Sequence, residues 1–466
     1  MVSAREGALG RLAVTLIVPM AALFLAQIPL PGLDIDAFDK LFAMASRSSD
    51  RQQIGIFCLQ LNPFFSAALL VEVLALAIPR WRAWRPGGYP ERGRIWTRVR
   101  IAALVMALIQ AFFISRWLKQ SAASFSFIPG LITDPDSPLM MAAQILTVAG
   151  GTFLLYALTR VIDGVGAGNG FSVMIVAFMA GPTVEAVIVS AQQRFQAGDR
   201  ILWPLAIAAV AVAAVTRLAG GGPLRPHASA PKAVELPTPS SGLQPVVASY
   251  ALMQMPKQLS VLGINLLPPA IESEIWLRRG AEAVAAAALC LLFAWLFNRP
   301  PAVAAAWERA GGPNADGAPA SDAVGVAFAR SLAGSLAVCW GLMGVQWICA
   351  DAALTVQLLN LVVIACVALD IAEELRFRLR NGALARVWPG HRLYVLPFML
   401  KALEAEGIPA FTRCRRHRTL WNFLTPYLPV EILVPVAHAI RAEAILRPLS
   451  GVPAEIAQAS PAPLPS

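Results

Sequence analysis

The sequence predicts an all-α polytopic membrane protein with ten transmembrane helices, followed by a small α+β domain. Three observations predict this class: about ten apolar stretches recur along the 466 residues, mean hydropathy is +0.62, and only 14% of the residues are charged. A bilayer core takes roughly 20 apolar residues as a helix, and lipid offers no partner to bare backbone groups. The predicted spans are residues 9–30, 56–78, 101–118, 139–160, 170–190, 201–217, 256–276, 281–297, 324–349 and 353–371.

The arginines between the second and third predicted spans set the topology. Residues 79–100 hold seven arginines and a single acid, Glu91. Because cytoplasmic loops carry an excess of Arg and Lys, this loop and both chain termini are expected in the cytoplasm. The net charge of +10 then reflects topology and attraction to anionic lipid, and no direct contact with nucleic acid is expected.

The membrane part divides into two halves of five spans each. Residues 1–195 hold spans one to five, and residues 196–380 hold spans six to ten, with a Gly-, Pro- and Ser-rich cytoplasmic loop within residues 219–255. An odd number of spans per half means that one half is inverted relative to the other. Such halves commonly meet at a central path through the membrane.

A small soluble domain of βαββα pattern is predicted at residues 386–448, and a disordered Pro- and Ala-rich tail at residues 449–466. Its strands are expected at residues 393–397, 408–413 and 430–435, and its helices at residues 398–406 and 437–446. The basic patch at residues 413–418 is interpreted as a solvated loop, with acidic lipid, a ribosome or another anionic partner as the alternative. Cys414 and His417 are too few ligands for a zinc site, and no cofactor is expected.

The strongest local pattern lies near the N-terminus. The sequence IPLPG at residues 28–32 precedes a short amphipathic stretch that runs to about Ala45, and the next span carries Pro63. A proline within a span removes one backbone hydrogen bond and kinks the helix. Together these features resemble the first two helices of SecY, the pore subunit of the protein translocation channel. In that family the segment after IPLPG forms a plug, here residues 35–45.

Further segments resemble SecY in the same order along the chain. They are GRIWTR at residues 93–98, DGVGAGNGFS at residues 163–172, PAI at residues 269–271, FNRP at residues 297–300, and the apolar run at residues 361–369 closed by Asp370. The resemblance covers residues 8–380 with gaps. It implies two inverted halves around an hourglass pore whose waist is a ring of apolar side chains.

The resemblance also implies site residues, each an expectation. The lateral gate, through which apolar segments leave for lipid, would lie between spans two and three and spans seven and eight. Glu72 lies deep in the second span, where a carboxylate must face a cavity or a partner. The pore ring would be Leu61, Phe65, Ile175, Ile271 and Val363; the plug would include Ile35, Phe38, Leu41 and Phe42; polar gate candidates are Ser66, Gln110 and Asn265, with simple helix packing as the equal alternative.

The chain departs from the family pattern at its docking loops. The cytoplasmic loops six–seven and eight–nine bind the ribosome or the SecA motor in this family and normally carry clustered arginines. Here the only basic residues in 219–246 are Arg225 and Lys232, besides His227. The only basic residues in 298–321 are Arg299 and Arg309. Fewer charges should weaken electrostatic docking.

The first functional hypothesis is a protein-conducting channel subunit that translocates unfolded polypeptides across the bacterial cytoplasmic (inner) membrane or inserts them into it. The alternative is a SecY-derived scaffold or regulator that no longer conducts; a small-solute carrier fits the motifs poorly. The expected partners are SecE-like and SecG-like subunits, SecA or a ribosome, unfolded preprotein and lipid. No enzymatic activity is expected, because the four histidines are scattered and the predicted spans carry no paired acids.

Overall fold

A computed structural model of the chain describes residues 2–34, 55–84, 89–124, 137–198, 202–220, 236, 239–250, 274–309, 320–352, 354, 356–390, 392–424 and 427–449. Its contacts divide the chain into two compact units. The first contains Met1–Pro182 and Phe423–Leu428, and the second contains Thr183–Asn422 and Pro429–Ala457. The boundary falls inside a helix that contains Pro182. The predicted division at residue 195 stays a prediction.

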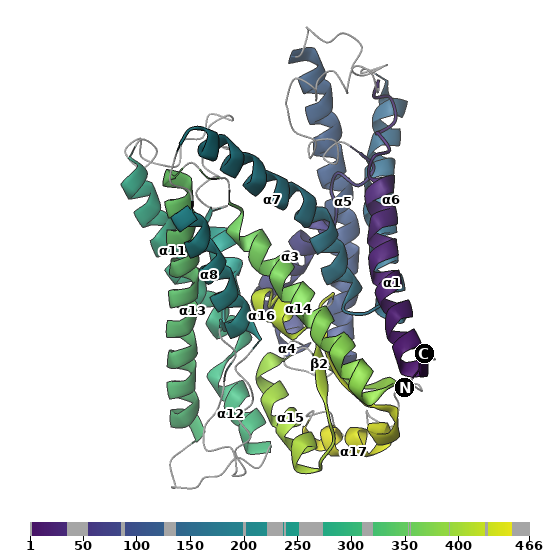
Figure 1. The fold of residues 1–466 in the computed structure, drawn as a ribbon, viewed down its shortest axis with the longest axis vertical. Helices are drawn as coiled ribbons and strands as arrows, with labels where there is room; N and C mark the ends of the chain where they lie inside the picture. The colour runs from purple at the N-terminus through teal and green to yellow at the C-terminus, as the bar shows by residue number, and fades with distance from the viewer. Residues whose placement is uncertain are drawn as a thin grey trace. The chain divides into compact units, whose positions relative to one another are not determined.

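The first unit is a group of helices. Figure 1 shows α5 and α6 as long neighbouring helices, and α1 lies along α6. Ser137 caps α6: its hydroxyl accepts a hydrogen bond from the Met140 N–H at 3.4 Å, and Pro138 occupies the first turn. The helices are α1 (Val2–Leu25), α3 (Asn62–Ala77), α4 (Pro79–Trp84), α5 (Tyr89–Ser124), α6 (Pro138–Val165) and the first part of α7 (Gly170–Gln196).

The helix that carries the second predicted span is shorter than expected. Pro29 and Gly55 form a β-bridge, and the Ile56 N–H donates to the Ile28 carbonyl at 3.0 Å. The chain then turns through Gln60, whose φ is +49°, and α3 begins at Asn62 with Pro63 in its first turn. Proline favours this position because its missing N–H would have no partner there. Residues 55–61 are therefore turns rather than helix.

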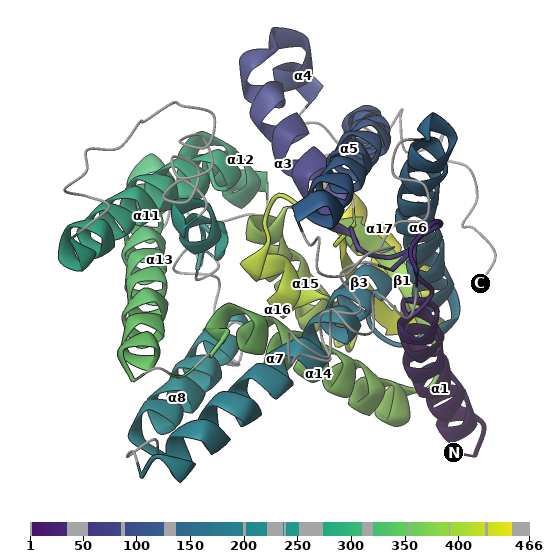
Figure 2. The same cartoon turned by 90° about the horizontal axis from the view of Figure 1, so that it is seen from above.

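The second unit holds the remaining apolar helices. Figure 2 shows α11, α12 and α13 as one neighbouring group. α14 ends at Gly382, whose φ of +76° suits a residue without a Cβ. The helices are α8 (Leu202–Ala219), α11 (Ile275–Phe297), α12 (Pro300–Arg309), α13 (Ala320–Asp351) and α14 (Leu358–Asn381).

Seven of the described helices are long and apolar enough to cross a membrane. They match seven of the ten predicted spans. The second span contains only the shorter apolar helix Asn62–Ala75, the tenth corresponds to the charged helix α14, and residues 256–273 of the seventh lie outside the described residues. The chain is thus a multi-pass membrane protein, and the count of ten stays a prediction.

The C-terminal part of the second unit contains a three-stranded antiparallel sheet of order β1-β3-β2. Its strands are β1 (Leu384–Gly390), β2 (Phe411–Arg413) and β3 (Val430–Pro435), and the register places Arg413 opposite Glu431. The strand predicted at residues 393–397 is wrong. Leu393–Val395 is a 3₁₀ turn that leads into α15 (Leu396–Ala405), because its apolar residues are all buried in one core.

This core includes residues from a predicted cytoplasmic loop. α17 (Ala439–Leu449) and α15 pack with the sheet, and Val303 and Trp307 of α12 join the same buried cluster. Val303 is fully buried and Trp307 is 6% exposed. Residues 300–309, expected as part of a docking loop, are instead an amphipathic helix packed against the sheet, α15 and α17, a region called the C-terminal domain below.

Candidate functional site

An aromatic cluster lies in the first unit, where α3, α6 and α7 meet. The ring of Phe64, on α3, stacks on the ring of Tyr156 of α6, with centroids 4.8 Å apart. It contacts the Phe171 ring of α7 edge-to-face, with centroids 6.3 Å apart. The Phe65 and Phe171 rings are 5.8 Å apart. Phe64 and Phe171 are at most 1% exposed. Aromatic pairs at these separations add to the free energy of simple burial.

A segment from the far end of the chain completes this cluster. Phe423–Leu428, of which 425 and 426 are outside the described residues, belongs to the first unit and is called the tail segment below. The Tyr427 ring stacks on Phe171 at 4.9 Å and meets Phe64 at 5.2 Å, and Phe423 meets Phe65 at 6.3 Å. Four of its side chains are 0–5% exposed: Phe423, Leu424, Tyr427 and Leu428.

The loop between α6 and α7 holds the tail segment by one directed hydrogen bond. The Asn169 side-chain amide donates to the Tyr427 carbonyl at 3.1 Å. Its carbonyl oxygen accepts from the Ser172 N–H at 3.0 Å and so caps α7. Asp163 accepts from the Gly170 N–H at 2.7 Å, and a Cβ at Gly170 would collide with the Thr159 carbonyl. The glycine-rich run is thus a tight helix connection, as its sequence predicts.

The Tyr427 hydroxyl is the cluster's unsatisfied group. It is buried and has no hydrogen-bond partner among the residues that the structure describes. Burial raises the pKa of this hydroxyl well above its ordinary value, so Tyr427 is neutral. A buried hydroxyl without a partner carries a desolvation cost that phenylalanine would not.

Three of the predicted pore residues lie beside this cluster. Leu61 and Phe65 are one turn apart at the start of α3, and Ile175 is one turn after Phe171 on α7. Leu61 and Ile175 are 3% and 9% exposed. Val363 lies on α14 in the second unit and is 1% exposed. Ile271 lies outside the described residues, so the ring as a whole stays a prediction.

Two predicted gate residues are brought together. The Gln110 amide of α5 donates to the Ser66 hydroxyl of α3 at 3.4 Å. Glu72, on the same helix, is 3% exposed. The third gate candidate, Asn265, and the plug residues Ile35, Phe38, Leu41 and Phe42 lie outside the described residues.

The second unit contains a buried ion-pair network that the sequence interpretation missed. Arg413 of β2 forms a bidentate ion pair with Glu374 of α14, with Nε–Oε2 at 2.9 Å and Nη2–Oε1 at 2.6 Å. Arg378 also donates to Glu374, at 2.9 Å, and Glu431 accepts from Arg413 and Arg386. Burial alone would raise the pKa of Glu374, but Arg413 and Arg378 hold it below its ordinary value.

A second pair of contacts extends this network along α14. The Arg416 guanidinium contacts Glu373 at 2.6 and 2.7 Å and Asp370 at 3.0 Å. The backbone N–H groups of Arg416 and His417 donate to Asp370 at 3.1 and 3.4 Å. Burial lowers the pKa of His417 to about 3, so its imidazole is neutral. The interpretation of residues 413–418 as a solvated loop is wrong: helix α16 (Arg415–Leu420) packs on α14.

A signal for this network was present in the sequence. Asp370, Glu373 and Glu374 are spaced i, i+3, i+4 and so share one face of a helix, and the basic run at residues 413–418 could neutralise them. The two segments are about 40 residues apart, and sequence pattern alone gives no means to pair them. In the described residues, no cluster of His, Cys, Asp and Glu is placed to hold a metal ion.

Polar bonds also join the C-terminal domain to the loop between spans six and seven. The Leu243 N–H donates to the Leu420 carbonyl at 2.8 Å, and the Asn422 amide donates to the Ser240 carbonyl at 2.9 Å. Asn298, at the end of α11, donates to the same carbonyl at 3.1 Å. Both predicted docking loops therefore contribute residues to contacts with the C-terminal domain.

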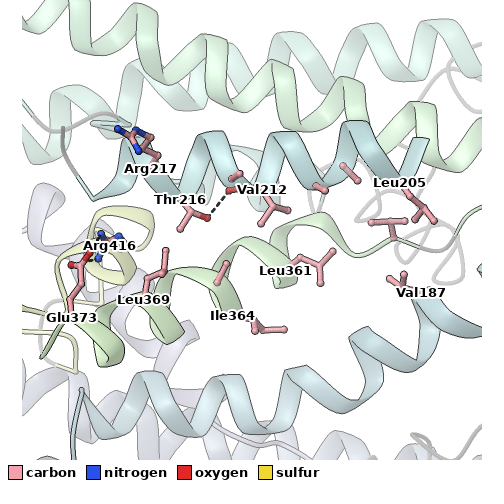
Figure 3. Close-up of a pocket in the computed structure, with 15 residues that line it drawn as sticks. Val187, Leu205, Val212, Thr216, Arg217, Leu361, Ile364, Leu369, Glu373 and Arg416 are labelled. Atoms are coloured by element: carbon pink, nitrogen blue, oxygen red, sulfur yellow. Dashed lines mark hydrogen bonds and ion pairs between the residues drawn. The ribbon is translucent and has the colours of Figure 1, made fainter. Parts of the chain in front are cut away.

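An apolar groove of about 890 Å³ lies in the second unit between α7, α8 and α14 (Figure 3). Arg217, Glu373 and Arg416 lie at one end of it, and the Thr216 hydroxyl is turned back to the Val212 carbonyl at 2.6 Å. Its apolar walls include Val187, Leu205, Ala209, Val212, Leu361, Ile364, Ala365 and Leu369.

Comparison with known proteins places these features in a family. The family model described as SecY matches residues 55–311, more than half of the chain. The protein translocase subunits SecY of Buchnera aphidicola subsp. Acyrthosiphon kondoi and of Escherichia coli (strain K12) are 29% and 28% identical over 226 residues, which is 45% of this chain. The match spans only 62% and 49% of those two relatives' lengths.

A solved structure of a SecY channel, reported in work on the plug domain and the closed state, resembles the fold. It is 14% identical with a TM-score of 0.50, and the match covers 79% of this chain and 92% of that one. At that identity the likeness concerns the fold alone. The match of the family model over more than half of the chain shows that the chain belongs to the SecY family.

Proposed function

We propose that the chain is a SecY-like protein-conducting channel subunit, which translocates unfolded polypeptides across the bacterial cytoplasmic membrane or inserts them into it. The observation that carries the proposal is the family match over residues 55–311, within which the candidate pore residues Leu61, Phe65 and Ile175 are all apolar. The protein would do no covalent chemistry. A motor, a ribosome or the membrane potential would supply the energy.

The mechanism depends on the apolar side chains of α3, α7 and α14. A dry ring of Leu61, Phe65, Ile175, Ile271 and Val363 would offer ions no replacement for their hydration, while a polypeptide in transit would fill it. The segment at residues 35–45 would close the ring from outside. Opening between α3 and α5, where Gln110 contacts Ser66, would release apolar segments into lipid.

An arrested secretory chain tests this proposal directly. A photoreactive amino acid at Phe65 of the channel should crosslink to the arrested chain, and one at Val105, a 48% exposed residue of α5, should not. Reconstitution with SecE-like and SecG-like subunits keeps the complex as it would exist in the membrane. If Phe65 gives no more crosslink than Val105, under conditions where an ordinary SecY does crosslink, the channel function is excluded.

The groove between α7, α8 and α14 supports a single-span partner of the SecE type. Its walls are apolar from Leu205 to Ala213 of α8, and in a membrane such a surface accepts a helix by close packing. A209W and A365W fill the groove and should reduce co-purification of a SecE-like subunit about tenfold or more. V284W, at a 71% exposed site on α11, is the control and should leave it unchanged. Equal recovery with all three variants would exclude this groove.

One observation favours the alternative, a scaffold or regulator that does not conduct. α12 from loop eight–nine is built into the core of the C-terminal domain, and Ser240 and Leu243 of loop six–seven bond to the same domain. These loops would bind SecA or the ribosome in a conducting channel. Co-sedimentation of the full chain with ribosomes, and with SecA, separates the two functions: binding comparable to an ordinary SecY supports conduction, and its absence supports the alternative.

A further inference from the structure

The tail segment occupies an aromatic surface of the first unit that adjoins the candidate pore residues Phe65 and Ile175. Phe65 contacts both Phe171 and Phe423, and Ile175 follows Phe171 by one turn of α7. By the predicted topology, α3 runs inward and α7 outward, so Phe171 and the tail segment lie on the cytoplasmic side of Ile175. A polypeptide that enters from the cytoplasm would meet the tail segment first.

The chemistry of the tail segment is that of a passing apolar segment. It presents two aromatic rings to a surface made of Phe64, Phe65 and Phe171. These rings and its two leucines are all 0–5% exposed. It is compact, since the N–H groups of Tyr427 and Leu428 donate to the Leu424 carbonyl at 3.0 and 2.8 Å. Apolar and aromatic contacts of this kind are non-directional, so another apolar segment can replace them.

Two features suit a contact that is released. The contact with the first unit is largely apolar: the rings of Tyr427 and Phe423 lie against Phe64, Phe65 and Phe171, and the Asn169 side-chain amide donates to the Tyr427 carbonyl. The Tyr427 hydroxyl is buried without a partner in the part of the chain that the structure describes. Release would return this hydroxyl to water and recover its desolvation cost.

We propose that the described residues of the tail segment, Phe423, Leu424, Tyr427 and Leu428, form a built-in cytoplasmic cover. It is seated on the face of α3 and α7 that carries Phe65 and Ile175, and an entering apolar polypeptide must displace it. The inference rests on the proposed channel function for its consequence, but the cover itself is a property of the folded chain. It differs from the family's plug, which lies at residues 35–45 and closes the channel from the other side.

Cysteine labelling measures the cover without any transport. The reporter is I175C in full-length protein with C58A, reconstituted and labelled from the cytoplasmic side by a membrane-impermeant maleimide. F423A/Y427A should raise the labelling rate at least fivefold. Y427F keeps the ring and removes the unsatisfied hydroxyl, so it should lower the labelling rate about fivefold or more. F112A is the control. It removes the contact between the Phe112 and Phe113 rings of α5, whose centroids are 5.7 Å apart, and it should leave the labelling rate unchanged.

A second measurement tests whether a translocating polypeptide displaces the cover. An arrested secretory chain is crosslinked to the same variants through a photoreactive group on the arrested chain. More crosslinking to F423A/Y427A and less to Y427F, in parallel with labelling, supports displacement. An unchanged labelling rate in F423A/Y427A, with its helical circular dichroism intact, overturns the cover. Changed labelling with unchanged crosslinking overturns displacement. Changed labelling with no crosslink in any variant sustains the cover and removes the channel function instead.

Discussion

The C-terminal part of this chain is attached by two contacts of opposite chemistry. On α14, Arg413 and Arg416 form short, bidentate ion pairs with Glu374 and Glu373 in the second unit. In the first unit, the tail segment is held by stacked rings and one hydrogen bond from Asn169. Paired buried charges are costly to separate, whereas apolar contacts can be exchanged for others of the same kind. We therefore interpret the first contact as permanent and the second as exchangeable.

The difference predicts that the largest loss of stability follows from breaking the α14 network. E374A leaves Arg413 and Arg378 buried without their shared carboxylate, which should destabilise the C-terminal domain by about 3–5 kcal/mol. Denaturant unfolding measures this change when it is followed by tryptophan fluorescence in a background where Trp388 and Trp421 are kept and the other ten tryptophans are replaced by phenylalanine. E374Q keeps the shape and one acceptor oxygen and should lose less. A loss below about 1 kcal/mol in E374A would show that the network is not the permanent attachment.

The same network could not be predicted from the sequence, for a physical reason. Helical periodicity places Asp370, Glu373 and Glu374 on one face, but it does not say what covers that face. Their partners come from β2 and α16, whose positions depend on how β3 pairs with β2 across the sheet. An unpaired basic run is most simply a solvated loop, so the prediction for residues 413–418 was wrong.

Structure set by local sequence motifs was predicted more successfully than contacts between distant segments. The apolar runs located seven helices that can cross a membrane, and the glycines near Asn169 identified a tight helix connection. The IPLPG motif and the ordered segments identified the family. The aromatic cluster escaped prediction. Phe65 was considered only as a wall residue of a pore and Phe171 only as part of a helix connection, and nothing near residue 427 in the sequence marks it as their partner.

Lowering the pH tests whether the contact between α16 and α14 stays buried. The folded pKa of His417 is about 3, below its ordinary value of about 6.5, so the unfolded chain binds the extra proton between these values. The contribution of His417 to the free energy of unfolding should therefore fall as the pH falls, by about 2 kcal/mol between pH 7 and pH 5. Asp370 accepts a hydrogen bond from the backbone N–H of His417 and is therefore an acid in direct contact with this residue.

The measurement is denaturant unfolding at pH 7 and pH 5, with H417N as the matched variant. H417N cannot titrate at this position, so its stability should fall less than that of the parent chain between pH 7 and pH 5, by about the contribution of His417. An equal pH dependence in both proteins would mean that His417 is hydrated in the folded state, and that the attachment is looser than its geometry indicates.

A smaller effect of opposite sign is expected at the exchangeable contact. Y427F removes a buried hydroxyl that lacks a partner among the described residues, and it preserves the stacking on Phe171. It should stabilise the docked tail segment by about 1 kcal/mol. Limited proteolysis within residues 420–430 measures docking and should slow in Y427F. Faster cleavage would show that the hydroxyl has a partner, and that the tail segment is held more specifically than apolar contact allows.

The smallest effect sharpens the comparison by separating burial from charge. Arg441 and Glu406 also form an ion pair in the C-terminal domain, but their side chains are 61% and 46% exposed. Water screens such a pair, so R441A should cost less than about 1 kcal/mol in the same unfolding measurement that reports E374A. If R441A and E374A cost the same, the number of ion pairs would matter rather than their burial. The contrast between a buried permanent attachment and an exchangeable one would then have no energetic basis.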